Sequence, residues 1–464
     1  MITKAALELP ASSGIAVIDD DATYSYDEFR TYVGQWSEWL SDSTCKCVVI
    51  DLRQGIVAYS LIWACYLNYV TFVPIYPDTP TERKSAIIGR VNADAVITEN
   101  LSDSMNPSIE VRTPDRLGRK LDSDNVAYVL FTSGSTAEPK GVMVRRDSLE
   151  WLISWSLGQF NIDTDTVWAQ YLKLGFDLAI FDVFAAINAG STLVAFANLG
   201  DLLRPFDRIK KYGITHWHTV PTVVNMWTTL TAPDESLASL KNFLFCGEPL
   251  YWDQVNRLQS LFPGCAIYNN YGPTETTMFV TSYRVPENAS INFGAEATVP
   301  LGSAVPGNLV YVDGSGGICG ELIVSGVNVA EGYIDGSAGG FHVAVDGSRG
   351  YRTGDLCHEN SGNLYFDGRA DTQIKHHGHR VDLAEIEAVL RKGGYCESYA
   401  QLVDGCITLF YSGGAAVEGS LVQYLRTYLP QYMVPTRIVT LDRIPRLSSG
   451  KVDRNALNRK TNRG

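Results

Sequence analysis

A loop of small residues follows an apolar segment early in the chain and could bind phosphate. After apolar residues 128–131 come the loop residues Thr132, Ser133, Gly134, Ser135 and Thr136, with Lys140 shortly behind them. Such a loop offers backbone N–H groups, hydroxyls and one cation to oxygen anions. It is not a Walker A loop, because that motif opens a helix, whereas apolar residues 142–144 predict another strand. The alternative interpretation is a surface hairpin of small residues.

Four later segments place reactive side chains in turn-rich surroundings. They are residues 269–277 with Tyr271, Thr274 and Glu275, residues 351–356 with Asp355, residues 368–371 with Arg369 and Asp371, and residues 444–454 with Lys451. A carboxylate such as Glu275 is the kind of ligand that Mg²⁺ prefers. A flexible ammonium such as Lys451 can reach between two anions, where the planar fork of arginine fits less well. Taken alone, each segment also fits an ordinary surface turn.

In this order, the five segments, together with residues 373–387 around Gly378, resemble the motifs of the adenylate-forming superfamily. That superfamily includes acyl-CoA synthetases, luciferases and the adenylation domains of nonribosomal peptide synthetases, and the resemblance extends from about Asp21 to Leu457. It implies ATP and Mg²⁺ as cofactors and two half-reactions. A carboxylic acid is first activated as an acyl-AMP with release of pyrophosphate, and the acyl group then passes to a thiol.

The resemblance also implies a role for each residue. Lys451, Thr274 and Glu275 would carry the catalysis, and Glu275 would hold the metal. The ATP site would consist of Thr132, Ser133, Gly134, Ser135, Thr136, Lys140, Gly247, Glu248, Tyr271, Asp355 and Arg369. Tyr271 would lie against the adenine, and Asp355 would accept both ribose hydroxyls. Asp371 would be the hinge of a small C-terminal domain that rotates between the half-reactions, bringing the segment around Gly378 to the thiol acceptor.

Residues 176–182 match the substrate motif of amino-acid-activating members, in which the position of Asp177 binds the α-ammonium group. A buried carboxylate needs a cationic partner to stay charged, and the substrate would provide it. The alternative is that Asp177 only caps the helix that follows. The other pocket positions carried across are Leu178, Phe181, Leu244, Cys246, Asn270, Met278 and Phe279. Two phenylalanines and a methionine leave little room, which favours a small side chain.

The segment 243–248 resembles the D-alanine–carrier protein ligases, so alanine of either chirality is the first choice of substrate. Glycine, serine and proline remain open. No Gly-Gly-x-Ser attachment motif follows Lys451, so the predicted acceptor is the phosphopantetheine thiol of a separate carrier protein, with coenzyme A as the competitor. Two other functions remain open: an acyl- or aryl-CoA ligase for a non-amino acid, and a nucleotide-binding regulator that has lost catalysis.

The framework expected for these residues is an α/β fold in two domains. The 464 residues are too many for one core. Helix-like and strand-like segments alternate over residues 26–97 and again over residues 149–280, which indicates parallel βαβ units. Residues 298–365 read as a small β-barrel-like module. We therefore expect an adenylation core over residues 1–370 and a mobile α+β domain with the catalytic lysine over residues 371–464.

Composition narrows the class of protein and its surroundings. The net charge is −13 without a basic block, so nucleic-acid binding is not expected. The nine cysteines show no repeated spacing, which favours free thiols in a reducing compartment. No apolar run is long enough for a signal peptide or a membrane span, so the expected location is the cytoplasm. His376, His377 and His379 lack the spacing of a zinc site and read as a polar loop.

Overall fold

The computed structural model describes residues 7–100, 105–112, 121–133, 138–225, 237–287, 297–314, 319–395, 397–412, 418–446 and 452–461. The chain divides into two compact units. The first comprises Met1–Pro77, Ile88–Leu130 and Gly141–Ala370, and the second comprises Asp78–Ile87, Phe131–Lys140 and Asp371–Gly464. No helix in the described ranges is both long and apolar enough to cross a membrane.

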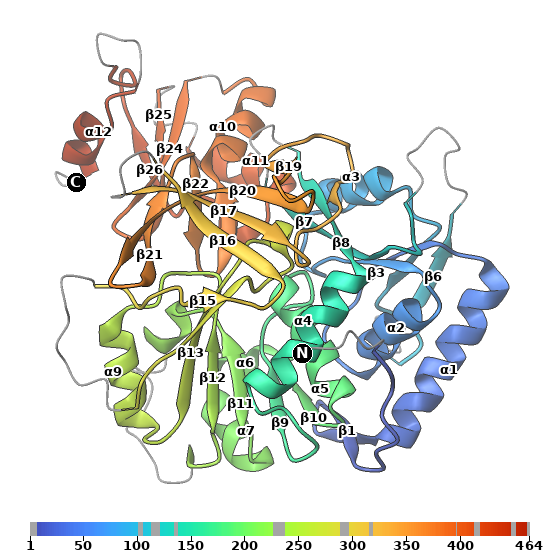
Figure 1. Cartoon of the computed structure of the whole chain (residues 1–464). Helices are drawn as coiled ribbons and strands as arrows, with labels where there is room; N and C mark the ends of the chain where they lie inside the picture. Colours follow the sequence, from blue (N-terminus) through green and yellow to red (C-terminus); the bar gives the residue numbers. More distant parts are fainter. Residues whose placement is uncertain are drawn as a thin grey trace. The chain divides into compact units, whose positions relative to one another are not determined.

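The largest sheet of the first unit has nine strands (Figure 1). In sheet order they are β15 (Ser303–Ala304), β14 (Thr281–Arg284), β13 (Ala266–Tyr271), β12 (Asn242–Phe245), β11 (His216–Thr219), β9 (Val167–Gln170), β10 (Thr192–Ala195), β1 (Ile15–Asp19) and β2 (Ala22–Ser25). The strands from β13 to β1 run parallel, and antiparallel strands extend both edges. The parallel strands expected over residues 149–280 are confirmed.

A second sheet has seven strands and is also mixed. In sheet order they are β18 (Gly332–Tyr333), β8 (Lys140–Arg145), β7 (Val126–Thr132), β4 (Thr71–Pro74), β3 (Cys47–Asp51), β5 (Ala95–Thr98) and β6 (Ser108–Val111). Strand β8 is the strand predicted after the small-residue loop, so a helix does not open there and the loop is not of the Walker type.

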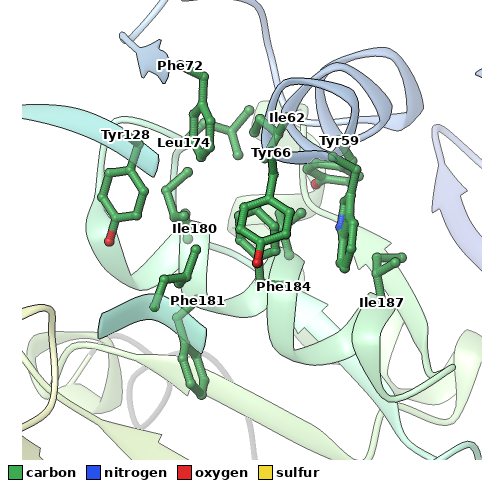
Figure 2. Close-up of a cluster of buried hydrophobic side chains, with 14 of the residues drawn as sticks. Tyr59, Ile62, Tyr66, Phe72, Tyr128, Leu174, Ile180, Phe181, Phe184 and Ile187 are labelled. Atoms are coloured by element: carbon green, nitrogen blue, oxygen red, sulfur yellow. The ribbon is translucent and has the colours of Figure 1, made fainter. Parts of the chain in front are cut away.

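Two apolar helices lie in the core of the first unit. The helices with residues in this unit are α1 (Tyr26–Ser43), α2 (Ile56–Leu67), α3 (Thr81–Val91, assigned to this unit from Ile88 onwards), α4 (Arg146–Gln159), α5 (Asp177–Asn188), α6 (Leu199–Leu203), α7 (Pro205–Tyr212) and α9 (Trp252–Leu261). Helices α2 and α5 are buried around nearly their whole circumference, as expected for helices that are apolar on every side. Figure 2 shows their side chains interleaved, with Tyr59 and Tyr66 from α2 and Ile180 and Phe184 from α5.

The third sheet of the first unit is antiparallel and open. Its strands are β16 (Asn308–Asp313), β17 (Gly320–Gly326), β20 (Arg349–Asn360), β19 (Phe341–Val343) and β21 (Asn363–Arg369). The expectation of a barrel-like module is wrong in this respect. The long strand β20 pairs with β17 on one edge, while β19 and β21 share its other edge at opposite ends. Strand β16 is thus one edge of the sheet and β19 and β21 are the other, and the described residues show no pairing between these edges that would close a barrel.

The second unit is a small α+β assembly. Its elements beyond Asp371 are β22 (Gln373–His376), β23 (His379–Asp382), α10 (Leu383–Lys392), β24 (Ser398–Val403), β25 (Cys406–Tyr411), α11 (Glu418–Tyr428), β26 (Arg437–Thr440) and α12 (Arg454–Thr461). Ile386, Leu409 and Leu425 lie in its core. Of the three histidines predicted in a polar loop, His377 lies in a turn, whereas His376 is the last residue of β22 and His379 is the first residue of β23.

Candidate active site

The predicted amino-acid pocket lies on one face of the nine-stranded sheet, under helix α5. Register pairs His218 with Leu244 and Leu244 with Tyr268 across β11, β12 and β13. Because side chains alternate along a strand, Cys246 and Asn270 follow on the same face, towards the carboxyl ends. In parallel sheets this edge is where ligands bind.

The lining side chains of this pocket are almost entirely buried. The exposed fractions are 0% for Phe181, Leu244, Met278 and Phe279, 1% for Cys246, 2% for Asn270 and 3% for Leu178. Met278 follows Thr277, and both have positive φ angles, 69° and 52°. Such angles are uncommon for residues with side chains and gather at functional sites. Leu178, Phe181, Leu244, Cys246, Met278 and Phe279 thus lie in one buried apolar cluster.

Asp177 is the first residue of α5 and connects the pocket to the turn that begins at Thr274. Its Oδ2 accepts a hydrogen bond from Thr274 Oγ1 at 2.7 Å, and its Oδ1 accepts one from Leu178 N at 2.9 Å. The N-cap position is Phe176, and Asp177 binds Thr274 as well as a backbone N–H of the first turn, so it does more than cap the helix. Burial raises the pKa of Asp177, and the hydrogen bond from Thr274 opposes that shift. A carboxylate in this position is stabilised by an arriving cation.

Three residues form a hydrogen-bonded cluster where β13 meets the third sheet. Tyr271 Oη donates to Asp355 Oδ2 at 2.6 Å, and Arg369 Nη1 donates to Asp355 Oδ1. Asp355 and Arg369 are register partners on β20 and β21, so the sheet itself fixes this pair. Burial, followed by the nearby Asp355 carboxylate, raises the pKa of Tyr271 well above its usual value. Each carboxylate oxygen accepts more than one hydrogen bond, so Asp355 retains acceptor capacity for a hydroxyl.

Glu275 sits in a single 3₁₀ turn, η2 (Thr274–Thr276), and is fully buried. Its Oε1 accepts a hydrogen bond from Tyr333 Oη at 2.7 Å. Thr277 Oγ1, in the same segment, is buried without a partner among the described residues. One carboxylate with a nearby unpaired hydroxyl fits Mg²⁺, which binds one or two carboxylates together with substrate phosphates. No cluster of three or more metal-ligating side chains occurs in the described parts of the chain.

Two further residues of the predicted ATP site support the loop after β11. Glu248 Oε2 accepts hydrogen bonds from the backbone N of Thr222, at 3.0 Å, and from its hydroxyl. Gly247 has a φ of 90°, a conformation that glycine adopts at no steric cost. Glu248 therefore holds Thr222, which follows β11, through both its backbone and its side chain.

The remaining predicted residues belong to the second unit. Thr132 ends β7 and Lys140 begins β8, both half-buried. Ser133 Oγ donates to Arg380 O at 2.7 Å and accepts from Asp382 N at 3.0 Å, so its hydroxyl is engaged by the backbone. Asp371 opens the C-terminal part of this unit, and its Oδ1 accepts from Gln373 N at 3.0 Å. Gly134, Ser135, Thr136 and Lys451 lie outside the described residues.

The structure adds residues that the sequence did not single out. Tyr333 holds Glu275 and lies 3.2 Å from Tyr351 Oη. His218 and Asp182 form a fully buried pair beneath the pocket, 2.8 Å apart. Asp182 stands in the substrate motif, which is the one signal that could have drawn attention to it. Tyr333 and His218 carry no such signal, because their partners are far along the chain.

Known proteins similar to this chain include carrier protein ligases and an adenylation domain. A D-alanine–D-alanyl carrier protein ligase of Staphylococcus epidermidis is 30% identical, with 96% of each chain covered. An L-proline–[L-prolyl-carrier protein] ligase of Streptomyces coelicolor is 38% identical over 72% of this chain and 66% of its own. The crystal structure of the Vibrio cholerae adenylation domain AlmE, in complex with glycyl-adenosine-5′-phosphate, superposes with a TM-score of 0.84. Its identity is 25%, over 97% of this chain and 95% of AlmE. The profile of the AMP-binding enzyme family matches residues 8–334, and the chain belongs to that family.

Proposed function

We propose that this chain activates a small amino acid with ATP and passes the aminoacyl group to the phosphopantetheine thiol of a separate carrier protein. The observation that carries the proposal is the 2.7 Å hydrogen bond between Thr274 Oγ1 and Asp177 Oδ2. It joins a carboxylate suited to the α-ammonium of an amino acid to the turn that would contact the α-phosphate. The relatives named as carrier protein ligases support the acceptor.

In the first half-reaction, a carboxylate oxygen of the amino acid bonds to the α-phosphorus of ATP, and the bond to pyrophosphate breaks. Both reactants are anions, so the barrier is one of repulsion and orientation. Asp177 would hold the ammonium group and thereby aim the carboxylate. Asp355 and Arg369 would position the ribose, and Tyr271 would lie beside the adenine.

Further groups are needed to neutralise the negative charge on the phosphates. Mg²⁺ on Glu275 would neutralise phosphate oxygens when bound. The small-residue loop over residues 132–136 and Lys140 would contact the β- and γ-phosphates, and Lys451 would place its ammonium between the two reactants. We assign ATP and amino-acid binding to residues 1–370 and the catalytic lysine to residues 371–464, with Asp371 as the hinge. Eight described cysteines are free thiols, which supports a reducing, cytoplasmic setting.

Alanine, of either chirality, is the first choice of substrate. The rings of Phe181 and Phe279 are fully buried and contact each other, with centroids 5.0 Å apart, and two such large side chains at pocket positions favour a small substrate side chain. Relatives named for D-alanine, at 28–30% identity over nearly the whole chain, point the same way. Glycine is the second candidate, favoured by the same closed lining and by the glycyl-adenylate in the AlmE structure.

Amino-acid-dependent exchange of labelled pyrophosphate into ATP tests the proposal. We expect exchange with alanine or glycine, and no exchange with propionate or acetate, which lack the ammonium group. In Asp177→Ala, exchange should no longer be faster with alanine or glycine than with propionate or acetate. If the purified protein activates aliphatic or aromatic acids without an amino group, and Asp177→Ala retains that activity, the chain is an acyl- or aryl-CoA ligase instead.

A further inference from the structure

A tyrosine that the sequence did not single out holds the carboxylate to which we assign Mg²⁺. Tyr333 Oη donates a hydrogen bond to Glu275 Oε1 at 2.7 Å, although 58 positions separate the two residues in the chain. Tyr333 is 4% exposed and Glu275 is 0% exposed, so bulk water hardly competes for this bond. The backbone of the same turn is held as well, because Ala330 N donates to Glu275 O at 2.9 Å. The segment 330–333 therefore holds Glu275 by its backbone and by its side chain.

The strand that carries Tyr333 belongs to the same sheet as the strand after the small-residue loop. Strand β18 pairs with β8, with Tyr333 opposite Val142. Ile334 N also donates to Gly141 O at 2.8 Å. Because β8 follows the loop proposed to bind phosphate, one short strand connects the turn with Glu275 to the first residues after that loop.

The ring and the hydroxyl of Tyr333 are held in one orientation. The ring packs edge to face on Phe341, with centroids 5.1 Å apart, and a Cβ added to Gly339 would lie 2.5 Å from its Cε2. Tyr351 Oη lies 3.2 Å from Tyr333 Oη. A phenol has one proton and an ionised carboxylate only accepts, so Tyr351 is the donor in this second contact. Ring packing and two hydroxyls together fix the direction of the bond to Glu275.

Resting on the function proposed above, we infer that Tyr333 is a positioning residue, which orients the Glu275 carboxylate for Mg²⁺ and affects the reaction only through Glu275. Mg²⁺ demands near-ideal octahedral geometry, so a carboxylate that can rotate binds it more weakly. Partners that orient a metal ligand are typically worth about 10- to 100-fold in metal affinity. Tyr333 thus adds a residue to the site without contacting the substrate.

Metal binding, measured without turnover, tests this role. Tyr333→Phe keeps the ring packing and removes only the hydroxyl. Electron paramagnetic resonance gives the dissociation constant of Mn²⁺, used in place of Mg²⁺, for the protein bound to α,β-methylene-ATP. This constant should rise by about 10- to 100-fold in Tyr333→Phe. The Mg²⁺ concentration for half-maximal pyrophosphate exchange should rise by a similar factor, whereas the KM for the amino acid at saturating Mg²⁺ should stay near that of wild type.

The chain offers a matched control in a second tyrosine–glutamate hydrogen bond. Tyr66 Oη, on α2, donates to Glu150 Oε1, on α4, at 2.8 Å, and neither residue belongs to the proposed site. Tyr66→Phe should leave the Mn²⁺ dissociation constant unchanged, even where thermal stability falls. Glu275→Gln should weaken Mn²⁺ binding by itself, and adding Tyr333→Phe to it should cause no further loss, because residues that act through one another are not additive.

Three outcomes would overturn the inference. They are an unchanged Mn²⁺ dissociation constant in folded Tyr333→Phe, a full further loss when this substitution is added to Glu275→Gln, and a wild-type nucleotide complex that binds no Mn²⁺. If Tyr333→Phe does not fold, Tyr351→Phe decides, because removing the donor to Tyr333 should also weaken Mn²⁺ binding, and an unchanged constant there excludes the role. Wild-type protein that binds Mn²⁺ but exchanges pyrophosphate with no amino acid would instead refute the proposed function.

Discussion

At the scale of single residues, the proposed function depends on the charge of Asp177. Its carboxyl is desolvated by burial, which raises its pKa, and the hydroxyl of Thr274 opposes that shift. The protonated, neutral form therefore persists to higher pH than in an ordinary aspartate. Only the ionised form attracts an ammonium group, so under the proposed function substrate binding would be coupled to the ionisation of Asp177.

This coupling predicts a pH dependence of amino-acid binding. As the pH falls through the raised pKa of Asp177, the KM for the amino acid should rise, while the KM for ATP changes less. Asp177→Asn should lower kcat/KM for the amino acid by about 10- to 100-fold, the value of a hydrogen bond to a charged group, and should flatten its pH profile in this range. Steady-state exchange kinetics across the acidic range measure both effects. An unchanged profile in Asp177→Asn would mean that another group binds the ammonium.

At the scale of elements, the turn after β13 depends on a close approach of two backbones. A Cβ added to Gly272 would lie 2.1 Å from Met278 O and 2.8 Å from Met278 C. Real contacts of this kind do not occur, so the backbone that carries Met278 would have to move. That segment also carries Glu275 and the strained Thr277, which the proposed mechanism uses.

Gly272→Ala should therefore impair both stability and activity. We expect a loss of about 1–3 kcal/mol in the free energy of unfolding, as for other overpacked sites, together with reduced exchange activity. Gly34 is the matched control, because it is exposed in the middle of α1 and an added Cβ meets nothing within 4 Å. Gly34→Ala should be neutral or stabilising by up to about 1 kcal/mol. Denaturant unfolding compares the two, and equal stabilities would contradict the close-approach argument.

Elements were easier to predict from the sequence than the contacts between them. The buried strand β3 and helix α2 follow from nearly continuous apolar runs, because parallel strands and the helices between two sheets are covered on all sides. The pairing of Asp355 with Arg369 depends on the register of β20 and β21, and the pair His218–Asp182 depends on the order of strands in the sheet. Local sequence contains neither piece of information. The open third sheet was mistaken for a barrel for the same reason.

At the scale of the whole molecule, the two units share the proposed chemistry unequally. The first unit contains Asp177, which is the proposed ammonium ligand, the turn with Glu275 and the Tyr271–Asp355–Arg369 cluster. The second contains Ser133, Lys140 and Asp371, and the chain continues through it to Lys451. A division of this kind predicts that some substitutions affect one half-reaction and spare the other.

Lys451 is the residue that should separate them. Its ammonium would neutralise charge that develops on the α-phosphate during adenylation, and removal of one such group typically costs about 10²- to 10³-fold in rate. Thiol attack on a finished aminoacyl-AMP needs no such group, because AMP is already a good leaving group. Lys451→Ala should therefore lose pyrophosphate exchange by that factor, yet still transfer the aminoacyl group from chemically prepared aminoacyl-AMP to carrier-bound phosphopantetheine.

Lys451→Arg keeps the charge but not the compact ammonium, and should restore exchange only in part. Lys460→Ala, on the exposed last turn of α12, should match wild type in both assays. Equal losses in the two half-reactions for Lys451→Ala would show that this lysine serves the structure rather than the adenylation step.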